Sequence, residues 1–305
     1  MSTTTAYVKM IKPADGDSAD IQVINGDLEK LDTWVEYDRQ SANNIYPGRN
    51  IENIAEFADE IQSAGSVYAF LHARAQAANF AGLRIGDYIE CNCGVYGTRR
   101  FAIAHFDPYY NMGDDGHVMG HHICFVDTAP VALPSSDSYV TNGSYIMWNT
   151  TATNQGNSSQ AAPYMISNLH AWEINRFLPA LPSGLQNVLI NRRALLETRY
   201  SSSGSLNAST GWAWNDLGKV WSFSEIEVYG CVVWGTPGYT VAESRQLDYF
   251  RAIRNQLSGG RVSWWLRSVS GSSSSNVCDV NGDGYATSAS ATHTWIRPRC
   301  GFLLG

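Results

Sequence analysis

Two glutamates, Glu225 and Glu227, stand close together in the segment SEIEVYG. Paired carboxylates are the groups that glycoside hydrolases use, one as the acid and one as the base or nucleophile. The alternation of the segment predicts a strand that places both side chains on one face. Glycoside hydrolysis needs carboxyl groups on opposite sides of a cleft, so we interpret the pair as structural and keep catalysis as the alternative.

The segment DVNGDG, residues 279–284, matches the beginning of a calcium-binding loop. A complete loop of this type has a bidentate glutamate at its twelfth position, which is Ser290 here. The flanking residues also have the pattern of strands and not of helices. We therefore predict a hairpin turn, with the positive φ at Asn281-Gly282 or Asp283-Gly284, and no metal; calcium is the alternative.

Several histidines and cysteines offer the soft ligands that suit zinc, but no C-x2-C spacing is present. His117 and His121 are four apart, yet Gly120 and the strand-like residues that follow argue against a helix. We favour packing in the core and loops over a structural metal. Residues 1–10 contain no export signal, so the cysteines are predicted to be reduced thiols. The residues weighed as zinc ligands are Cys91, Cys93, His105, His117, His121, His122 and Cys124.

Composition excludes two classes of partner. The 305-residue chain has a net charge of −7 and a pI near 5.5. Nucleic acids and anionic membranes both reward a basic surface, so neither is expected to bind. No run of 18 apolar residues is present, and insertion into a membrane is not expected. Nothing in the sequence requires a cofactor.

The candidate carboxylate, histidine and cysteine residues lie among short strands and a few helices. This mixed pattern predicts the α+β class. Strands are predicted at residues 86–92 and 99–106. The segment SWWLRSV also alternates as a strand does. Apolar residues at helical spacing predict two helices, one on Met165, Leu169 and Trp172 that ends near Pro179, and one on Leu247, Phe250 and Leu257.

The pattern divides the chain into three parts. Residues 1–48 are predicted to be a small attachment segment, in which Val23, Ile24, Leu28 and Leu31 have the spacing of one face of a short helix. Residues 49–84 contain two helical patterns separated by Gly65 and are predicted to be a connector or an oligomerisation segment. Residues 85–305 contain the strands and the long polar loops.

Four segments in residues 85–305 stand out together: HHICFVD (121–127), GWAWNDLGKVWSFSEIEVYG (211–230), SWWLRSV (263–269) and IRPRCGFLLG (296–305). In their order and spacing they resemble a domain of tail proteins of phages and prophages of gut Firmicutes. That domain is similar to the C-type-lectin-like fold of formylglycine-generating enzymes and of the variable proteins of diversity-generating retroelements. The resemblance implies that SWWLRSV is a core strand in which Arg267 is paired internally, in preference to a ligand platform. Near the other end, DIQVINGDLEKLD (20–32) resembles the segment with which phage tail-fibre proteins begin.

The resemblance implies a receptor-binding protein of the virion, at the tail tip or fibre, that is assembled in the bacterial cytoplasm and is not an enzyme. Its partners would be a bacterial surface protein or glycan and, through the N-terminal segment, other tail proteins; a homo-oligomer is expected, with a trimer favoured. The formylglycine-generating relatives use reactive cysteines in a copper site, but neither Cys278 nor Cys300 matches that motif, and both are interpreted as small buried side chains. An enzyme on the same fold (a cell-envelope hydrolase or an oxidase) and a structural tail decoration are the alternatives.

In retroelement-diversified proteins the variable residues lie near the C-terminus, and residues 268–294 consist almost wholly of the residue types that changes of Asn codons produce. We predict a polar ligand-binding face made of adaptable hydrogen-bonding residues. The frame that holds it is predicted to be Trp264, Leu266, Ile296, Pro298, Phe302 and Leu303. The predicted ligand-binding residues are Ser272, Ser274, Asn276, Asp279, Asn281, Asp283, Tyr285, Thr287, Ser288, Ser290, Thr292 and His293.

Overall fold

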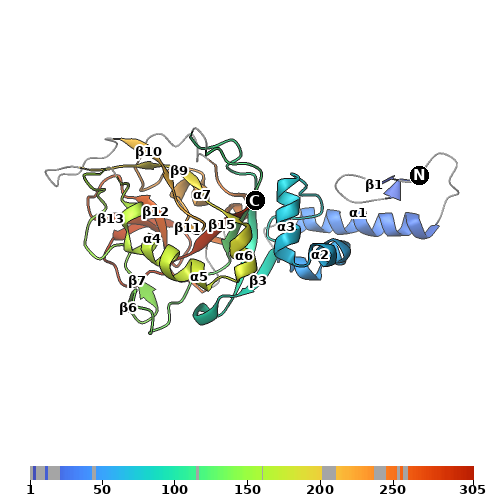
Figure 1. Ribbon diagram of the computed structural model, residues 1–305, viewed down its shortest axis with the longest axis horizontal. Coiled ribbons are helices and arrows are strands. Elements are labelled where there is room, and N and C mark those ends of the chain that lie inside the picture. Colours follow the sequence, from blue (N-terminus) through green and yellow to red (C-terminus); the bar gives the residue numbers. More distant parts are fainter. Residues whose placement is uncertain are drawn as a thin grey trace.

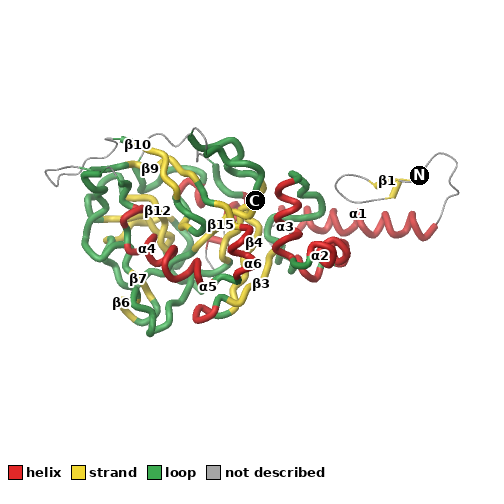
Figure 2. Tube along the Cα trace, viewed as in Figure 1, coloured by secondary structure: helices red, strands yellow, loops and turns green. Residues whose placement is uncertain are grey.

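The computed structural model of the chain describes residues 3–4, 11–12, 21–42, 46–114, 117–159, 161–200, 211–236, 245–252, 255–256 and 260–305. The chain is 31% helical and 25% strand, and its sheets are antiparallel, which makes it an α+β protein as the sequence predicts. Figure 2 shows helices α1–α3 at one end of the molecule and most of the strands gathered in a body at the other.

Helix α1 (Ile21–Ala42) extends away from the body and is drawn in blue in Figure 1. Strands β1 (Thr3–Thr4) and β2 (Ile11–Lys12) pair with each other. The guanidinium group of Arg84 lies 4.9 Å from the ring of Trp34 and 4.6 Å from that of Tyr37, so cation–π contacts fix the second half of α1. The predicted short helix is confirmed, and it continues to Ala42, well beyond Leu31, the last of the predicted apolar positions.

The connector contains α2 (Ala58–Ala64) and α3 (Val67–Gln76), after 3-10 turns at Ile51–Asn53 and Ala55–Phe57. Gly65 ends α2 with a φ of +82°, a conformation that suits glycine. Ser66 then caps α3 by accepting a hydrogen bond from the backbone N–H of Ala69 at 3.1 Å. The break at Gly65 and the second helical pattern are confirmed; the first pattern is an α-helix only from Ala58 on, because its earlier residues form the two 3-10 turns.

The largest sheet has the strand order β11-β15-β5-β4-β3, and β8 also pairs with β15. The C-terminal strand β15 lies in the interior of this sheet and is buried along its whole length. The predicted strands at residues 86–92 and 99–106 are confirmed as β3 and β4. The bounds are β3 (Tyr88–Asn92), β4 (Thr98–Phe106), β5 (Ile123–Asp127), β8 (Leu189–Ile190), β11 (Trp221–Ser222) and β15 (Cys300–Leu304).

A second sheet has the order β12-β13-β14, and its last two strands form a hairpin. The predicted core strand SWWLRSV is confirmed as β12, because Trp264, Trp265 and Leu266 are fully buried. Two further hairpins pair β6 with β7 and β9 with β10. The bounds are β6 (Val140–Asn142), β7 (Tyr145–Ile146), β9 (Arg193–Glu197), β10 (Trp212–Asp216), β12 (Trp264–Val269), β13 (Asn276–Val280) and β14 (Ala286–Ser290).

The helix predicted to end near Pro179 is confirmed from Asn168 on. It consists of α4 (Asn168–Trp172), a π-helical turn (Glu173–Phe177) and α5 (Leu178–Ala180), and the extended Ser167 separates it from a 3-10 turn (Tyr164–Ile166). Helix α6 (Ser183–Val188) follows, and α7 (Glu225–Tyr229) lies farther along the chain. A short 3-10 turn (Gly94–Tyr96) connects β3 to β4.

The helix predicted on Leu247, Phe250 and Leu257 is not continuous in the described part. Asp248–Arg251 form a single 3-10 turn, residues 255–256 are helical, and Leu257 lies outside the described residues. The side-chain amide of Gln256 donates to the carbonyl of Phe250 at 3.0 Å. Ala252 is extended, which ends the turn.

Candidate functional site

The predicted strand at Glu225 and Glu227 is wrong, because this segment is helix α7. Ser224 and Glu227 form a capping box: the hydroxyl of Ser224 accepts from the N–H of Glu227, and the carboxylate of Glu227 accepts from the N–H of Ser224 at 2.7 Å. Gly230 ends the helix with a φ of +78°. A helix of five residues is too short to show helical periodicity in a sequence, so the S-x-x-E spacing was the available signal.

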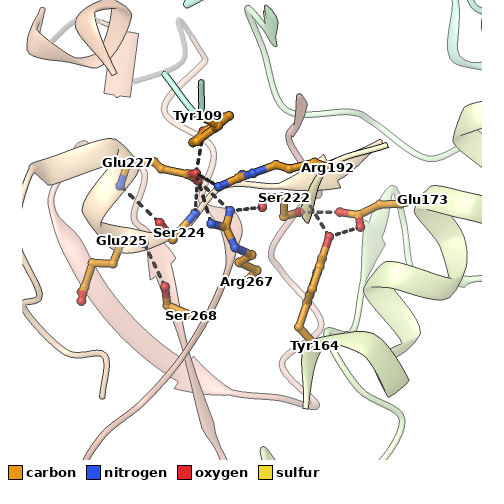
Figure 3. A network of polar contacts seen from close by, with 10 residues as sticks. All are labelled: Tyr109, Tyr164, Glu173, Arg192, Ser222, Ser224, Glu225, Glu227, Arg267 and Ser268. Carbon is orange, nitrogen blue, oxygen red and sulfur yellow. Dashed lines mark hydrogen bonds and ion pairs between the residues drawn. The ribbon is translucent and has the colours of Figure 1, made fainter. Parts of the chain in front are cut away.

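Glu227 is the centre of a buried network of charges (Figure 3). Its carboxylate lies 2.5 Å from a guanidinium nitrogen of Arg192 and 2.6 Å from one of Arg267, and the hydroxyl of Tyr109 donates to it at 2.6 Å. The four side chains are almost completely buried. Burial alone would raise the pKa of Glu227, but the two guanidinium groups hold it well below its usual range. The internal pairing predicted for Arg267 is confirmed.

A second carboxylate, that of Glu173, lies in the same interior. The hydroxyls of Tyr164 and Ser222 both donate to it, the second at 2.5 Å. The hydroxyl of Tyr164 in turn accepts from the N–H of Ser222 at 2.9 Å. A guanidinium nitrogen of Arg267 also donates to the carbonyl of Ser222 at 2.9 Å, which links the two carboxylate centres through β11. This arrangement fixes the frame around β11 and β12.

Glu225 points away from Glu227 and fixes a loop (Figure 3). Its two carboxylate oxygens accept from three successive backbone N–H groups, those of Val233, Trp234 and Gly235, at 2.8 to 2.9 Å. These three hydrogen bonds hold the loop of residues 233–235 against the start of α7. The two glutamates therefore have separate structural roles, as predicted, although the reason is a helix and not a shared strand face.

A pocket of about 80 Å³ lies between α7, β12 and the β9–β10 hairpin. Its lining includes Glu225, Glu197 and Arg267. Glu225 is bound by the loop amides and Glu197 lies 3.7 Å from Arg199. Both lining carboxylates are thus engaged by the protein itself, and this pocket does not present a pair of free carboxyl groups.

Residues 281–284 of the segment DVNGDG lie in the turn of the β13–β14 hairpin, which confirms the predicted hairpin turn. The side-chain oxygen of Asn281 accepts from the N–H groups of Asp283 at 2.9 Å and Tyr285 at 3.2 Å. Gly284 has the positive φ, +87°. Asp283 forms an ion pair with Arg261. Of the residues that the calcium interpretation would use, Asn281 and Asp283 are therefore engaged in the turn or in an ion pair, and Asp279 belongs to strand β13.

The predicted frame residues are all buried. The predicted ligand-binding residues divide into three groups by exposure. Asp279 is buried, at 2% exposure, and its side chain is not on the surface. The exposed residues are Ser272, Ser274, Asp283, Tyr285 and His293, and the half-buried ones are Asn276, Asn281, Thr287, Ser288, Ser290 and Thr292.

The alternation of side chains along β14 also divides this set between two faces. Ser288 pairs with Cys278 and Ser290 with Asn276, so these residues share one face of the hairpin. Thr287 pairs with Asp279 and belongs to the opposite face. A ligand on one face of the hairpin would contact only part of the predicted set, which the sequence span alone did not reveal.

Asp279 is the exception to the predicted polar face for a physical reason. It lies on β13, the middle strand of the second sheet, where it pairs with Trp265 of β12. Burial raises the pKa of its carboxyl from the ordinary 3.8 to about 7. Within the part of the chain that the structure describes, its oxygen Oδ1 has no hydrogen-bond partner. Asp279 is therefore buried like the frame residues, and its carboxyl group has a raised pKa.

Three large aromatic side chains are exposed in the hairpin turn, against the hairpin or shortly after it in the chain, and two of them were not predicted. Trp234 is 45% exposed and its indole N–H donates to the carbonyl of Ala286 at 3.2 Å, beside Tyr285, which is 59% exposed. Trp295 is 60% exposed and its ring lies 5.4 Å from that of Tyr145. The sequence holds a partial signal for Trp295, since it directly precedes the predicted frame residue Ile296.

The histidine and cysteine cluster is packed as interpreted. His121 bonds to Asp107 at 2.7 Å and stacks on Tyr110, and His122 is buried, which lowers the pKa of its ring to about 4. Cys91 and Cys93 are buried thiols whose pKa values burial raises. In the described ranges no group of three or more His, Cys, Asp or Glu side chains has the arrangement of a metal site.

The buried frame residues, the charge network and the exposed side chains together define an α+β domain. Its surface carries exposed aromatic and hydroxyl groups over a packed interior. A family model described as "Domain of unknown function (DUF6273)" matches residues 138–302, slightly more than half of the chain, and the chain belongs to this family. The match includes α7, the second sheet and both exposed tryptophans. No curated protein and no solved structure matches the chain. Among the described residues, no helix has both the length and the apolar character to cross a membrane.

Proposed function

We propose that this chain is a receptor-binding protein of a phage tail, and that its body is a C-type-lectin-like domain that binds a bacterial surface protein or glycan. The binding surface is the set of exposed side chains around the β13–β14 hairpin, named here the hairpin surface: Trp234, Tyr285, Trp295 and the exposed and half-buried Ser, Thr, Asn and His residues between Ser272 and His293. The virion tail tip or fibre is the proposed location.

The exposed aromatic side chains carry this proposal. Trp234, Tyr285 and Trp295 are about half exposed, although five other tryptophans of the chain are completely buried. Large aromatic rings exposed to water next to hydroxyl and amide groups are typical of binding surfaces, because they supply contact area at a small entropic cost while the polar groups supply adaptable hydrogen bonds. Trp234 is also held in place, since its backbone N–H binds Glu225.

An enzyme on the same fold receives less support from the geometry. The carboxylates Glu225 and Glu227 are engaged by backbone amides and by arginines, so a hydrolase would have to break the frame to use them. Cys278 and Cys300 are completely buried, and burial raises their pKa values well above the ordinary range, which opposes formation of a reactive thiolate. A structural tail decoration would not require the exposed tryptophans.

The test is binding of the labelled full chain to intact cells of gut Firmicutes strains and to arrays of purified envelope glycans. For a strain or glycan that binds, we expect each of Trp234→Ala, Tyr285→Ala and Trp295→Ala to reduce affinity by at least about tenfold, as expected for aromatic residues that dominate an interface. Tyr110→Ala is the matched control, because Tyr110 is an exposed aromatic residue far along the chain from the hairpin. Unchanged binding of the triple variant, with an unchanged melting temperature, would refute the hairpin surface.

Sequence variation between isolates tests the retroelement part of the proposal. Substitutions should concentrate in residues 270–294 and should fall on its exposed and half-buried positions. Buried positions of the same span, such as Val277 and Val280, should stay constant. A template repeat and a reverse transcriptase near the gene are also expected; substitutions spread evenly over the chain would contradict hypervariability.

A further inference from the structure

The β6–β7 hairpin presents two tyrosines on its outer face. Val140 pairs with Ile146, and Ile146 is completely buried. Side chains alternate between the two faces of a strand, so the residues directly before these two, Tyr139 and Tyr145, point to the opposite face. Both tyrosines are half-buried there. Their rings therefore belong to one outward surface, at the edge of the body (Figure 1).

A guanidinium group lies over each of these rings. That of Arg297 is 5.1 Å from the ring of Tyr145, and that of Arg176 is 5.9 Å from the ring of Tyr139. Trp295, which is 60% exposed, lies beside the first pair, with 5.4 Å between its ring and that of Tyr145. We name these five residues the arginine–aromatic face.

Neither arginine forms an ion pair with a carboxylate in the described part of the chain. The side chain of Arg176 donates to the hydroxyl of Ser138 at 3.0 Å, and that of Arg297 donates to the hydroxyl of Ser144 at 2.6 Å. A serine hydroxyl carries no charge, so it orients a guanidinium group without neutralising it. The arginine–aromatic face thus carries two positive charges, although the whole chain has a net charge of −7.

The acidic residue next to this face in the sequence, Asp137, is bound by other groups. Its carboxylate accepts from the hydroxyl of Tyr96 at 2.6 Å, from the indole N–H of Trp172 at 3.0 Å and from the backbone N–H of Tyr139 at 3.0 Å. These hydrogen bonds hold Asp137 in place, and it forms no ion pair with Arg176. An anion from outside the chain is therefore the complementary group for this face.

We propose that the arginine–aromatic face binds an acidic group, carboxylate or phosphate, of an envelope glycan. This inference rests on the proposed function and names the ligand class of the binding surface, which it extends from Trp295 to the β6–β7 hairpin. The planar guanidinium group matches the oxygen atoms of carboxylates and phosphates. The aromatic rings offer flat apolar area to the sugar ring that carries the acid.

The tip of the hairpin adds groups that suit sugar hydroxyls. Thr141 is exposed and Asn142 is half-buried, and both lie in β6 beside the two tyrosines. Hydroxyl and amide side chains donate and accept hydrogen bonds, as sugar hydroxyls do. Aromatic rings, cations and small polar groups on one hairpin together favour a glycan over an acidic loop of a surface protein, which is the other outcome of the test below.

The net charge of the chain favours a sparsely charged glycan. Polyanions such as nucleic acids bind through many phosphate contacts to a basic surface, whereas this face offers two cations on an acidic chain. Long-range attraction of a polyanion is therefore not expected. We expect a ligand whose acidic groups are separated by neutral sugars, so that one or two of them meet the arginines by direct contact.

The test is binding of the full chain to an array of purified envelope glycans, each printed in three forms. One form is native, one has its carboxyl groups reduced to alcohols, and one is dephosphorylated with hydrofluoric acid. We expect affinity for the native form to fall by at least about tenfold after one of the two treatments, as for loss of a charge-assisted hydrogen bond. The effective treatment distinguishes carboxylate from phosphate.

Substitution of the arginines tests which residues meet the acid. Arg297→Gln and Arg176→Gln should each weaken binding of the native glycan by about tenfold, but should bind the neutralised form as wild type does, because the lost partner is already absent. A purely structural effect would weaken both forms alike. Arg176 is exposed, so its variant keeps the fold. Arg100→Gln is the matched control, because Arg100 lies 4.7 Å from the ring of Tyr88 but is paired with Glu90.

The outcomes separate this inference from the proposed function. Equal binding of native and neutralised glycans, or arginine variants that bind the native form like wild type, would overturn the inference; loss of binding in Trp234→Ala would then still support the hairpin surface. Binding to a surface protein of intact cells and to no glycan would also overturn it and leave a receptor-binding protein. Binding to neither cells nor glycans would refute both.

Discussion

Replacement of Asp279 by Asn should change how the stability of the protein depends on pH. Asp279 is 2% exposed on β13, and burial raises the pKa of its carboxyl from 3.8 to about 7. In the folded protein this carboxyl keeps its proton up to about pH 7, whereas in the unfolded chain it loses the proton near pH 4. Burial of the charged form is therefore a destabilising contribution that Asn, which has nearly the same shape and no charge, does not make.

The sign and size follow from linkage. Because the folded pKa is the higher one, the contribution of Asp279 to stability is most favourable below pH 4, declines as the pH rises from 4 to 7, and is constant above 7. Each pKa unit corresponds to about 1.4 kcal/mol. A rise of about 3 units, from 3.8 to about 7, therefore gives a decline of about 4 kcal/mol between these pH values. The variant lacks this decline.

The assay is urea unfolding of wild type and Asp279→Asn, followed by tryptophan fluorescence at pH 4.5 and pH 8. The difference between the two proteins isolates Asp279, because all other titrating groups are shared. Because part of the decline already lies below pH 4.5, the variant should gain about 3 kcal/mol relative to wild type at pH 8 over its value at pH 4.5. Asp283→Asn is the control, since Asp283 is exposed in the same hairpin. A difference between variant and wild type that does not change with pH would refute the reasoning.

Three further substitutions test the frame, each by urea unfolding. Glu227→Gln should destabilise the protein by about 3–5 kcal/mol, because two buried guanidinium groups lose their carboxylate partner; equal stability would show that the network contributes little. Ser224→Ala should cost about 1 kcal/mol through loss of the helix cap. Gly301→Ala should unfold the body or sharply lower its stability, since the added Cβ would lie 2.3 Å from a ring carbon of Phe223, whereas Gly120→Ala, where nothing lies within 4 Å, should be neutral.

Local patterns were sufficient where the structure is set by neighbours in the sequence. The strands β3 and β4, the break at Gly65 and the hairpin turn at residues 281–284 are all confirmed, because turn chemistry and alternation act over a few residues. The internal pairing of Arg267, which the resemblance implies, is also confirmed, and a charged residue in a buried strand needs such a partner.

The sequence did not predict features that depend on distant segments. The strand predicted at Glu225 and Glu227 is a helix, because alternation over seven residues cannot be told apart from one short capped turn. The exposure of Trp234 depends on a loop that Glu225 holds. Asp279 has the same sequence pattern as its polar neighbours, and only its pairing with Trp265 shows that it is buried.

The charge network explains how a surface could change its residues while the fold stays constant. Glu227 connects α7, β12 and Arg192, and Glu225 binds the loop of Trp234 through three backbone amides. None of these contacts uses a side chain of the predicted ligand-binding set. Substitutions at exposed positions such as Ser272, Ser274 and His293 would therefore remove none of these contacts, whereas a substitution at the buried Asp279 changes the interior. Whether a position of this surface tolerates substitution should therefore depend on how exposed its side chain is, and not on the residue types found in residues 268–294.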